Sequence, residues 1–136
     1  MTTKEIVKSW YANIDNRNFE GNRNLMADNH RFHNPMTPEA IGAVEHIGLQ
    51  RMMTEAFTGS HHIDRIIEED GWVAVQARWS GKHTGEFQGV AATDNDVEFT
   101  FADFFEIVDG KVVNEYLELN PTVIMVQIGA MESQQA

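Results

Sequence analysis

The chain has 136 residues, of which 42% are hydrophobic and only 3 are proline, so length and composition favour one globular domain over a disordered protein. Its 21 Asp and Glu residues outnumber 10 Lys and Arg residues, and the formal net charge of -11 makes nucleic acid and anionic membrane surfaces poor partners. The absence of cysteine excludes a disulfide framework and a thiolate nucleophile, and it fits a reducing cytoplasm.

The first half of the chain shows three helical patterns, over residues 3–18, 20–27 and 47–57. Thr2 and Glu5 stand at the spacing of a capping box, and apolar residues follow on one face of the first helix. Gly59 is expected to cap the third helix at its C-terminal end. Residues 31–34 form a short extended piece that ends at Pro35.

The second half changes to strand patterns rich in β-branched and aromatic residues, over residues 62–67, 72–80, 82–88, 97–108 and 111–119. Turn signals separate these strands at Asp70-Gly71, Gly81 and Asp109-Gly110. Residues 89–96 read as a polar loop between the third and fourth strands. A short helix is predicted from Pro121 to Val126, and residues 129–136 are expected to form a frayed tail.

Helices followed by antiparallel strands predict the α+β class, with a single domain over residues 1–136. We expect a cone-shaped α+β barrel, in which the N-terminal helices pack on a strongly curved antiparallel sheet and enclose a cavity. Such cavities hold small apolar ligands. The first residues carry no long apolar run, and no segment approaches the roughly 18 to 20 apolar residues of a membrane span, so we expect a soluble, cytoplasmic protein.

The last hairpin predicts which side chains face that cavity. A two-residue turn at Asp109-Gly110 would pair Asp103 with Tyr116 and place alternate residues on one face. The predicted cavity face therefore carries Phe99, Phe101, Asp103, Phe105, Asn114, Tyr116, Glu118 and Asn120. The opposite face also carries apolar residues, and we expect it to meet a second subunit in a homodimer.

Five sequence features, in this order, point to a family. They are Gly81-Lys82-His83-Thr84-Gly85-Glu86-Phe87-Gln88-Gly89, Asp109-Gly110-Lys111, Tyr116, Asn120 and Gln127-Ile128-Gly129. With this pattern the chain resembles the SnoaL-like polyketide cyclase and ester cyclase family, within the superfamily named for nuclear transport factor 2. The resemblance runs from about Phe57 to Gly129, and the N-terminal helices match in order and size.

The resemblance implies a cavity enzyme without a cofactor. In such enzymes an aspartate at the end of the last long strand removes a proton beside a carbonyl, and the enolate closes a ring by aldol attack. That aspartate falls on Asn120 here, and an amide cannot exchange a proton at neutral pH. Asp103 is therefore the best remaining base, Glu118 the second, and His83 a hydrogen-bonding support.

The wider set of ligand-binding candidates is Asn120, Tyr116, Asn114, Phe101, Phe105, His33, Arg78 and Trp10. Asn120 has a second interpretation as the N-cap of the helix that begins at Pro121. The resemblance places His33 at the cavity mouth, whereas Trp10 is better explained by core packing. Arg78 with Asp103 raises an epoxide hydrolase of the limonene type, which shares this superfold and needs an Asp-Arg-Asp trio.

Three functions remain open on the sequence alone. The first is a cyclase or isomerase that transfers protons, the second is a binding protein that kept the fold and lost its base, and the third is a dimeric interaction module. The partner is a small molecule in the first two. Six histidines are present, but the close pairs His30 with His33 and His61 with His62 lack metal-site spacing, so we expect no metal and no cofactor.

Overall fold

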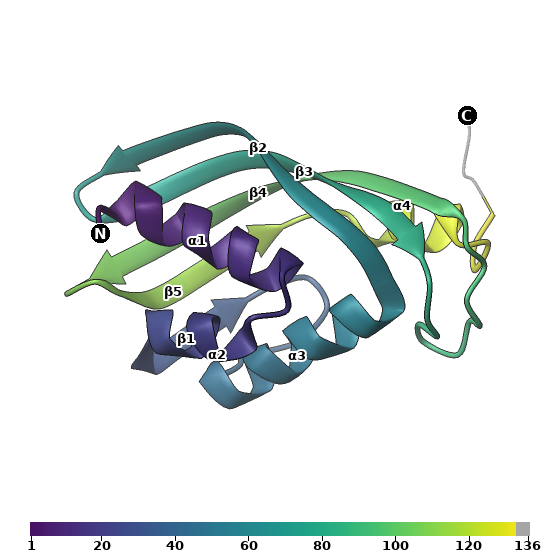
Figure 1. Cartoon of the computed structure of the whole chain (residues 1–136), viewed down its shortest axis with the longest axis horizontal. Helices are drawn as coiled ribbons and strands as arrows, with labels where there is room; N and C mark the ends of the chain where they lie inside the picture. The colour runs from purple at the N-terminus through teal and green to yellow at the C-terminus, as the bar shows by residue number, and fades with distance from the viewer. Residues whose placement is uncertain (133–136) are drawn as a thin grey trace.

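A computed structural model describes residues 1–132 of the chain. The elements are α1 (Thr3–Asp15), α2 (Phe19–Leu25), β1 (Met26–His33), α3 (Ala43–Ala56), β2 (Phe57–Glu69), β3 (Trp72–His83), β4 (Asp96–Val108), β5 (Lys111–Glu118) and α4 (Pro121–Gln127). The strands form one sheet in the order β1-β5-β4-β3-β2, in which β1 and β5 are parallel and the other neighbours antiparallel. The sheet is curved and open, with β1 and β2 at its edges (Figure 1). The predicted α+β class is confirmed.

The helix α1 is the central element on the concave side of the sheet (Figure 1). Its capping box is present, since Thr2 and Glu5 exchange side-chain and backbone hydrogen bonds. Four residues of its apolar stripe are buried, namely Ile6, Val7, Trp10 and Tyr11. The helix α3 lies beside β1 on the same side, whereas α4 lies at the far end of the curved sheet (Figure 1).

Two glycines that were predicted to end elements lie inside strands. The strand β2 begins directly after α3, so Gly59 is not a helix cap, and β3 continues through Gly81, so no turn divides it. The two glycines pair with each other, and a Cβ on Gly59 would lie 2.7 Å both from Cα of Gly81 and from the ring of Trp79. Their lack of side chains is what lets the Trp79 ring lie close to both strands.

The last hairpin explains one wrong prediction about the cavity face. Asp109 and Gly110 have φ values of 52° and 76°, as a two-residue turn requires, and Val108 pairs with Lys111 as predicted. A β-bulge then shifts the register, because Ile107 pairs with Val112 but Glu106 pairs with Asn114, which leaves Val113 as an extra residue.

Beyond the bulge every side chain of β5 turns to the other face. The residues that face inward on β5 are Glu115 and Leu117, opposite Phe105 and Asp103 of β4. The prediction was correct for β4 and wrong for β5, since Asn114, Tyr116 and Glu118 pair with outward residues of β4.

The C-terminal helix α4 starts where the sequence predicted. The side chain of Asn120 accepts a hydrogen bond from the backbone N–H of Thr122 at 3.1 Å, and Pro121 follows the cap. After α4, Gly129 has a φ of 79° and the N–H of Ala130 donates to the carbonyl of Met125 at 2.9 Å. The beginning of the predicted frayed tail is therefore held to α4, and residues 133–136 of that tail lie outside the described residues. No helix within residues 1–132 has the length and apolar character needed to cross a membrane.

Candidate functional site

A cavity of about 350 Å³ opens between the concave face of the sheet and the helices α1 and α3. Its apolar walls include Leu49, Met53, Trp79, Phe99, Phe101, Leu117 and Leu119. Its polar lining residues include Tyr11, Asp15, His46, Gln50, His61, Asp103 and Glu115. Apolar walls with a few converging polar groups, in a volume of this size, are typical of small-molecule sites.

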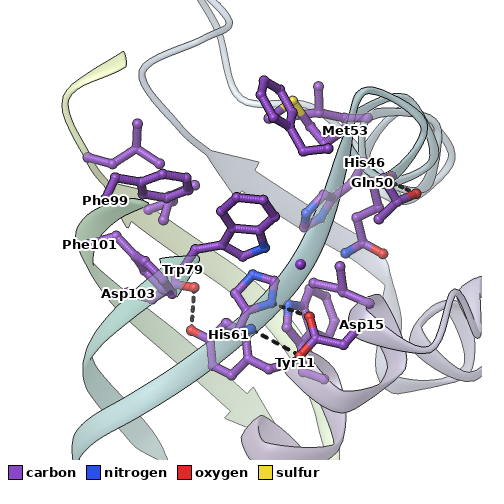
Figure 2. A pocket seen from close by; sticks show the side chains of 18 of the residues that line it. Tyr11, Asp15, His46, Gln50, Met53, His61, Trp79, Phe99, Phe101 and Asp103 are labelled. Carbon is purple, nitrogen blue, oxygen red and sulfur yellow. Dashed lines mark hydrogen bonds and ion pairs between the residues drawn. The ribbon is translucent and has the colours of Figure 1, made fainter. Parts of the chain in front are cut away.

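Two carboxyl groups lie side by side under α1. Asp103 on β4 is 1% exposed and Glu115 on β5 is 3% exposed, and the two are within hydrogen-bonding reach of each other. The hydroxyl of Tyr11 donates to Oδ2 of Asp103 at 2.7 Å, which Figure 2 shows as a dashed line. We call Asp103 and Glu115 the carboxyl pair.

Burial controls the protonation of the carboxyl pair. It raises the pKa of Asp103 to about 7, although hydrogen bonds from Glu115 and Tyr11 lower that pKa. Burial, followed by the charge of Asp103, raises the pKa of Glu115 well above its ordinary value. Burial and the charge of Asp103 also raise the pKa of the Tyr11 hydroxyl. The pair therefore holds at least one proton at neutral pH.

Two buried histidines indicate which carboxyl holds that proton. Nδ1 of His30 lies 2.9 Å from the carbonyl oxygen of Val112, and because a carbonyl only accepts, that nitrogen carries the ring proton. Burial lowers the pKa of His30 and of His46, so both rings are neutral. Nε2 of His30 then accepts from Nδ1–H of His46 at 2.9 Å.

His46 consequently turns a lone pair toward the carboxyl pair. Its Nε2 lies 3.6 Å from Oε1 of Glu115, and the ring is held by stacking on Phe32 at 3.7 Å between centroids. An unprotonated nitrogen facing a carboxyl favours the protonated form of that carboxyl. This contact favours a proton on Glu115, and the hydroxyl of Tyr11 donates to Asp103.

Unpartnered polar atoms also gather in the cavity. Within residues 1–132, four buried side-chain polar atoms lack a hydrogen-bond partner, and three of them belong to cavity-lining residues, namely Gln50 Nε2, Asp103 Oδ1 and Glu115 Oε1. Buried polar groups are nearly always paired, so these atoms give the cavity hydrogen-bonding capacity that the protein itself leaves unused.

A second pair of ionisable residues lies on the same wall. Asp15, the last residue of α1, accepts hydrogen bonds from Nδ1 of His61 at 2.6 Å and from the backbone N–H of His61 at 3.0 Å. Figure 2 shows both bonds beside Tyr11. Across residues 1–132, no three His, Cys, Asp or Glu side chains gather in a way that could hold a metal ion.

The structure places only part of the predicted site in the cavity. Asp103, Phe101 and Trp10 line it, and Phe105 is buried with its ring 5.7 Å from that of Trp10. Glu118 and Asn120 are exposed, and neither lines the cavity.

Three other predicted ligand-binding residues form a cluster on the convex face. The ring of His33 stacks on Tyr116 at 4.0 Å between centroids, and its Nε2 lies 3.0 Å from Oδ1 of Asn114. Their position follows from the bulge in β5 and from the pairing of His33 with Tyr116 in the parallel strands. None of the three lines the cavity.

Arg78 and His83 also lie away from the cavity. Arg78 binds Asp64 on the convex face, with Nε at 3.0 Å from Oδ2. His83 is fully buried, and its Nδ1 accepts from the backbone N–H of Thr93, so His83 holds the loop between β3 and β4.

Sequence reasoning missed most of the polar lining. Glu115 was assigned to the outer face because the bulge at Val113 has no local signal. Tyr11 did have a signal, because it is a polar handle within the apolar stripe of α1. The sequence suggested His61 only as a possible metal ligand and did not suggest His46, since the partners of both histidines are distant in sequence.

The comparisons with known proteins agree with this arrangement. The model of the SnoaL-like polyketide cyclase family matches residues 4–128. The chain belongs to this family. The resemblance drawn from the sequence is confirmed, and it extends to the N-terminal helices. No curated protein sequence matches this SnoaL-like chain significantly.

Solved structures share the fold of this SnoaL-like protein at low sequence identity. AclR from Streptomyces galilaeus has a TM-score of 0.87 at 20% identity, over 98% of this chain and 84% of its own. A SnoaL-like protein from Jannaschia sp. CCS1 has a TM-score of 0.86 at 22% identity, over 95% and 92%. An LEH-like epoxide hydrolase from M. tuberculosis has a TM-score of 0.73 at 15% identity, over 93% and 88%. These likenesses establish the fold.

Proposed function

We propose that the protein is a cofactor-independent enzyme that transfers protons to and from a small carbonyl-bearing ligand, as an aldol cyclase or an isomerase. The observation that carries this proposal is the carboxyl pair, buried yet lining a cavity of small-molecule size. A carboxyl whose pKa burial raises to about 7 can both give and take a proton at neutral pH.

The chemistry follows from where the proton is held. The carboxyl pair passes its proton to the carbonyl oxygen of the ligand while a basic group of the cavity takes the proton that the neighbouring carbon loses, which forms an enol. Attack of the enol carbon on a second carbonyl closes a ring, the pair recovers its proton from the enol oxygen, and the protonated base gives its proton to the alkoxide that the second carbonyl becomes. The unpartnered amide N–H of Gln50 can donate to the developing charge on the ligand, and the hydroxyl of Tyr11 donates to Asp103 and so stabilises its carboxylate.

The alternatives fit these contacts less well. A protein that only binds gains nothing from two adjacent buried carboxyls, which are costly to bury. Epoxide hydrolysis of the limonene type needs an arginine between two aspartates, and Arg78 instead pairs with Asp64 on the convex face. An interaction module would fill its cavity with side chains, whereas this cavity is open.

The test is turnover of an anthraquinone-type polyketide methyl ester by three forms of the protein. We expect the wild type to cyclise it and Asp103→Asn to lower kcat by about 10²-fold or more. Asn120→Asp serves as the control, and we expect it to match the wild type because Asn120 caps α4 outside the cavity. Equal activity of Asp103→Asn and wild type, or activity of Asn120→Asp alone, would contradict the proposal.

We also infer that the protein is a homodimer joined through the convex face of the sheet. In support, four large apolar side chains from four strands are exposed on that face, namely Ile67, Trp72, Phe104 and Tyr116. Trp72 and Tyr116 lie 6.1 Å apart between ring centroids, so the patch is continuous. A face of this kind pairs with itself about a two-fold axis.

A further inference from the structure

Asp15 and His61 form a two-point contact at the edge of the cavity. One carboxylate oxygen of Asp15 accepts from the backbone N–H of His61, and the other lies 2.6 Å from Nδ1 of its ring. The backbone contact alone would tie the end of α1 to β2. The ring contact is additional, and it fixes the orientation of the imidazole.

The contact also fixes the ring proton. A carboxylate only accepts, so Nδ1 of His61 carries the proton and Nε2 keeps its lone pair in the neutral ring. Within residues 1–132, no group hydrogen-bonds that Nε2, and His61 lines the cavity. Asp15 lines the same cavity. A histidine held by a carboxylate through Nδ1, with Nε2 unpartnered, has the arrangement of a general base.

Asp15 and His61, which we call the dyad, lie within reach of the same ligand as the carboxyl pair. The ring of Tyr11 lies against that of His61, tilted by 33° at 5.0 Å between centroids, and its hydroxyl donates to Asp103 at 2.7 Å. Phe101 lies beside both rings, at 5.8 Å from His61 and 5.9 Å from Tyr11. Figure 2 shows His61, Tyr11 and Asp103 on one side of the cavity. One aromatic ring therefore separates the two ionisable units.

We propose that His61, oriented by Asp15, is the base that removes a carbon-bound proton from the ligand while the carboxyl pair acts as the acid. The inference rests on the proposed function and divides its two proton transfers between two groups. The C–H bond breaks and its proton goes to Nε2 of His61. The electron pair forms the C=C bond of the enol, and the carbonyl oxygen takes the proton of the carboxyl pair. The substrate class is a ketone with an acidic C–H next to its carbonyl.

The experiment follows exchange of the acidic C–H of β-tetralone, a bicyclic ketone, in heavy water by proton NMR. His61→Asn keeps a hydrogen bond to Asp15 and removes the base, and we expect exchange to slow by about 10²–10⁴-fold. In Asp15→Asn the amide oxygen still accepts from the backbone of His61, but its NH₂ donates to Nδ1 and moves the ring proton to Nε2. We expect a similar loss for that variant.

The matched control is His62→Asn. His62 is the next residue of β2, is exposed, and bonds Ser60 and Ser80 away from the cavity. We expect it to exchange the ketone like the wild type. A nitrogen NMR spectrum of the histidine rings gives a second readout that needs no ligand, with the proton of His61 on Nδ1 in the wild type and on Nε2 in Asp15→Asn.

The outcomes separate this inference from the proposed function. Loss of exchange in Asp103→Asn with full exchange in His61→Asn would overturn the role of His61 and leave the proposed function standing. Absence of exchange by the wild type would overturn the proposed function and, with it, the role of His61. A wild-type ring proton on Nε2 of His61 would overturn the dyad whatever the exchange assay gives.

Discussion

At the scale of single residues, the carboxyl pair combines its proposed function with a cost in stability. Asp103 and Glu115 are both buried, and burial favours their neutral forms. A surface aspartate would be ionised at neutral pH and could not serve as an acid. The same burial that suits Asp103 to the proposed acid–base role therefore makes the folded state less stable as the pH rises.

Asp103→Asn is expected to stabilise the protein at pH 8. The unfolded chain releases the proton of Asp103 near a pKa of about 4, whereas the folded chain keeps it up to about 7. The free energy of unfolding of the wild type therefore falls, on the order of 4 kcal/mol, as the pH rises from about 4 to about 7. The asparagine variant lacks this loss, and urea unfolding from pH 4 to 8 measures the difference.

Asp64→Asn provides the control of opposite sign. The hydrogen bond from Arg78 lowers the pKa of Asp64, so this exposed group adds stability above the unfolded pKa of about 4 and loses it only as the pH falls below that value, which urea unfolding extended to about pH 2 would record. If the free energy of unfolding of Asp103→Asn varies with pH between about 4 and 8 in the same way as that of the wild type, the assignment of a raised pKa to Asp103 is contradicted.

At the scale of elements, the features that the sequence predicted correctly are those that neighbouring residues determine. The capping box at Thr2, the turn at Asp109-Gly110 and the N-cap at Asn120 are each set by neighbouring residues, and each is present. The bulge at Val113 is decided by packing across the sheet, so periodicity alone assigned β5 to the wrong face.

The paired glycines give a test at this scale. Gly59→Ala would place a Cβ 2.7 Å from the Trp79 ring and against the backbone of β3, so we expect a loss of at least about 1–3 kcal/mol in the free energy of unfolding. Gly48→Ala in α3 meets nothing within 4 Å and is expected to gain up to about 1 kcal/mol through helix propensity. Urea unfolding measures both, and equal stabilities would refute the close approach.

At the scale of the whole molecule, the site is assembled from elements far apart in sequence. Tyr11 comes from α1, His46 from α3, His61 from β2, and Asp103 and Glu115 from β4 and β5. The family and the fold could be predicted from motifs in their order, and so could the place of Asp103. The partners of Asp103 could not, because Tyr11 depends on how α1 lies against the curved sheet and Glu115 depends on the bulge in β5.

The convex face of the sheet gives a prediction about the oligomeric state of the protein. Phe104 is 42% exposed at the centre of the patch, and Phe104→Glu would place a charge in the proposed homodimer interface. We expect this variant to be a monomer by light scattering at concentrations where the wild type is a dimer. Val44→Glu changes an exposed residue of α3 and should leave the dimer intact. A monomeric wild type would contradict the dimer.

The most direct measurement is an NMR titration of the carboxyl carbons of Asp103 and Glu115, with no ligand present. We predict that one carboxyl stays protonated through neutral pH and that the other titrates near 7, because both are buried beside each other. Such a pair has a proton to exchange with a carbonyl ligand. Ionisation of both carboxyls by about pH 5, as for exposed carboxyls, would contradict the proposed acid–base role of this cavity.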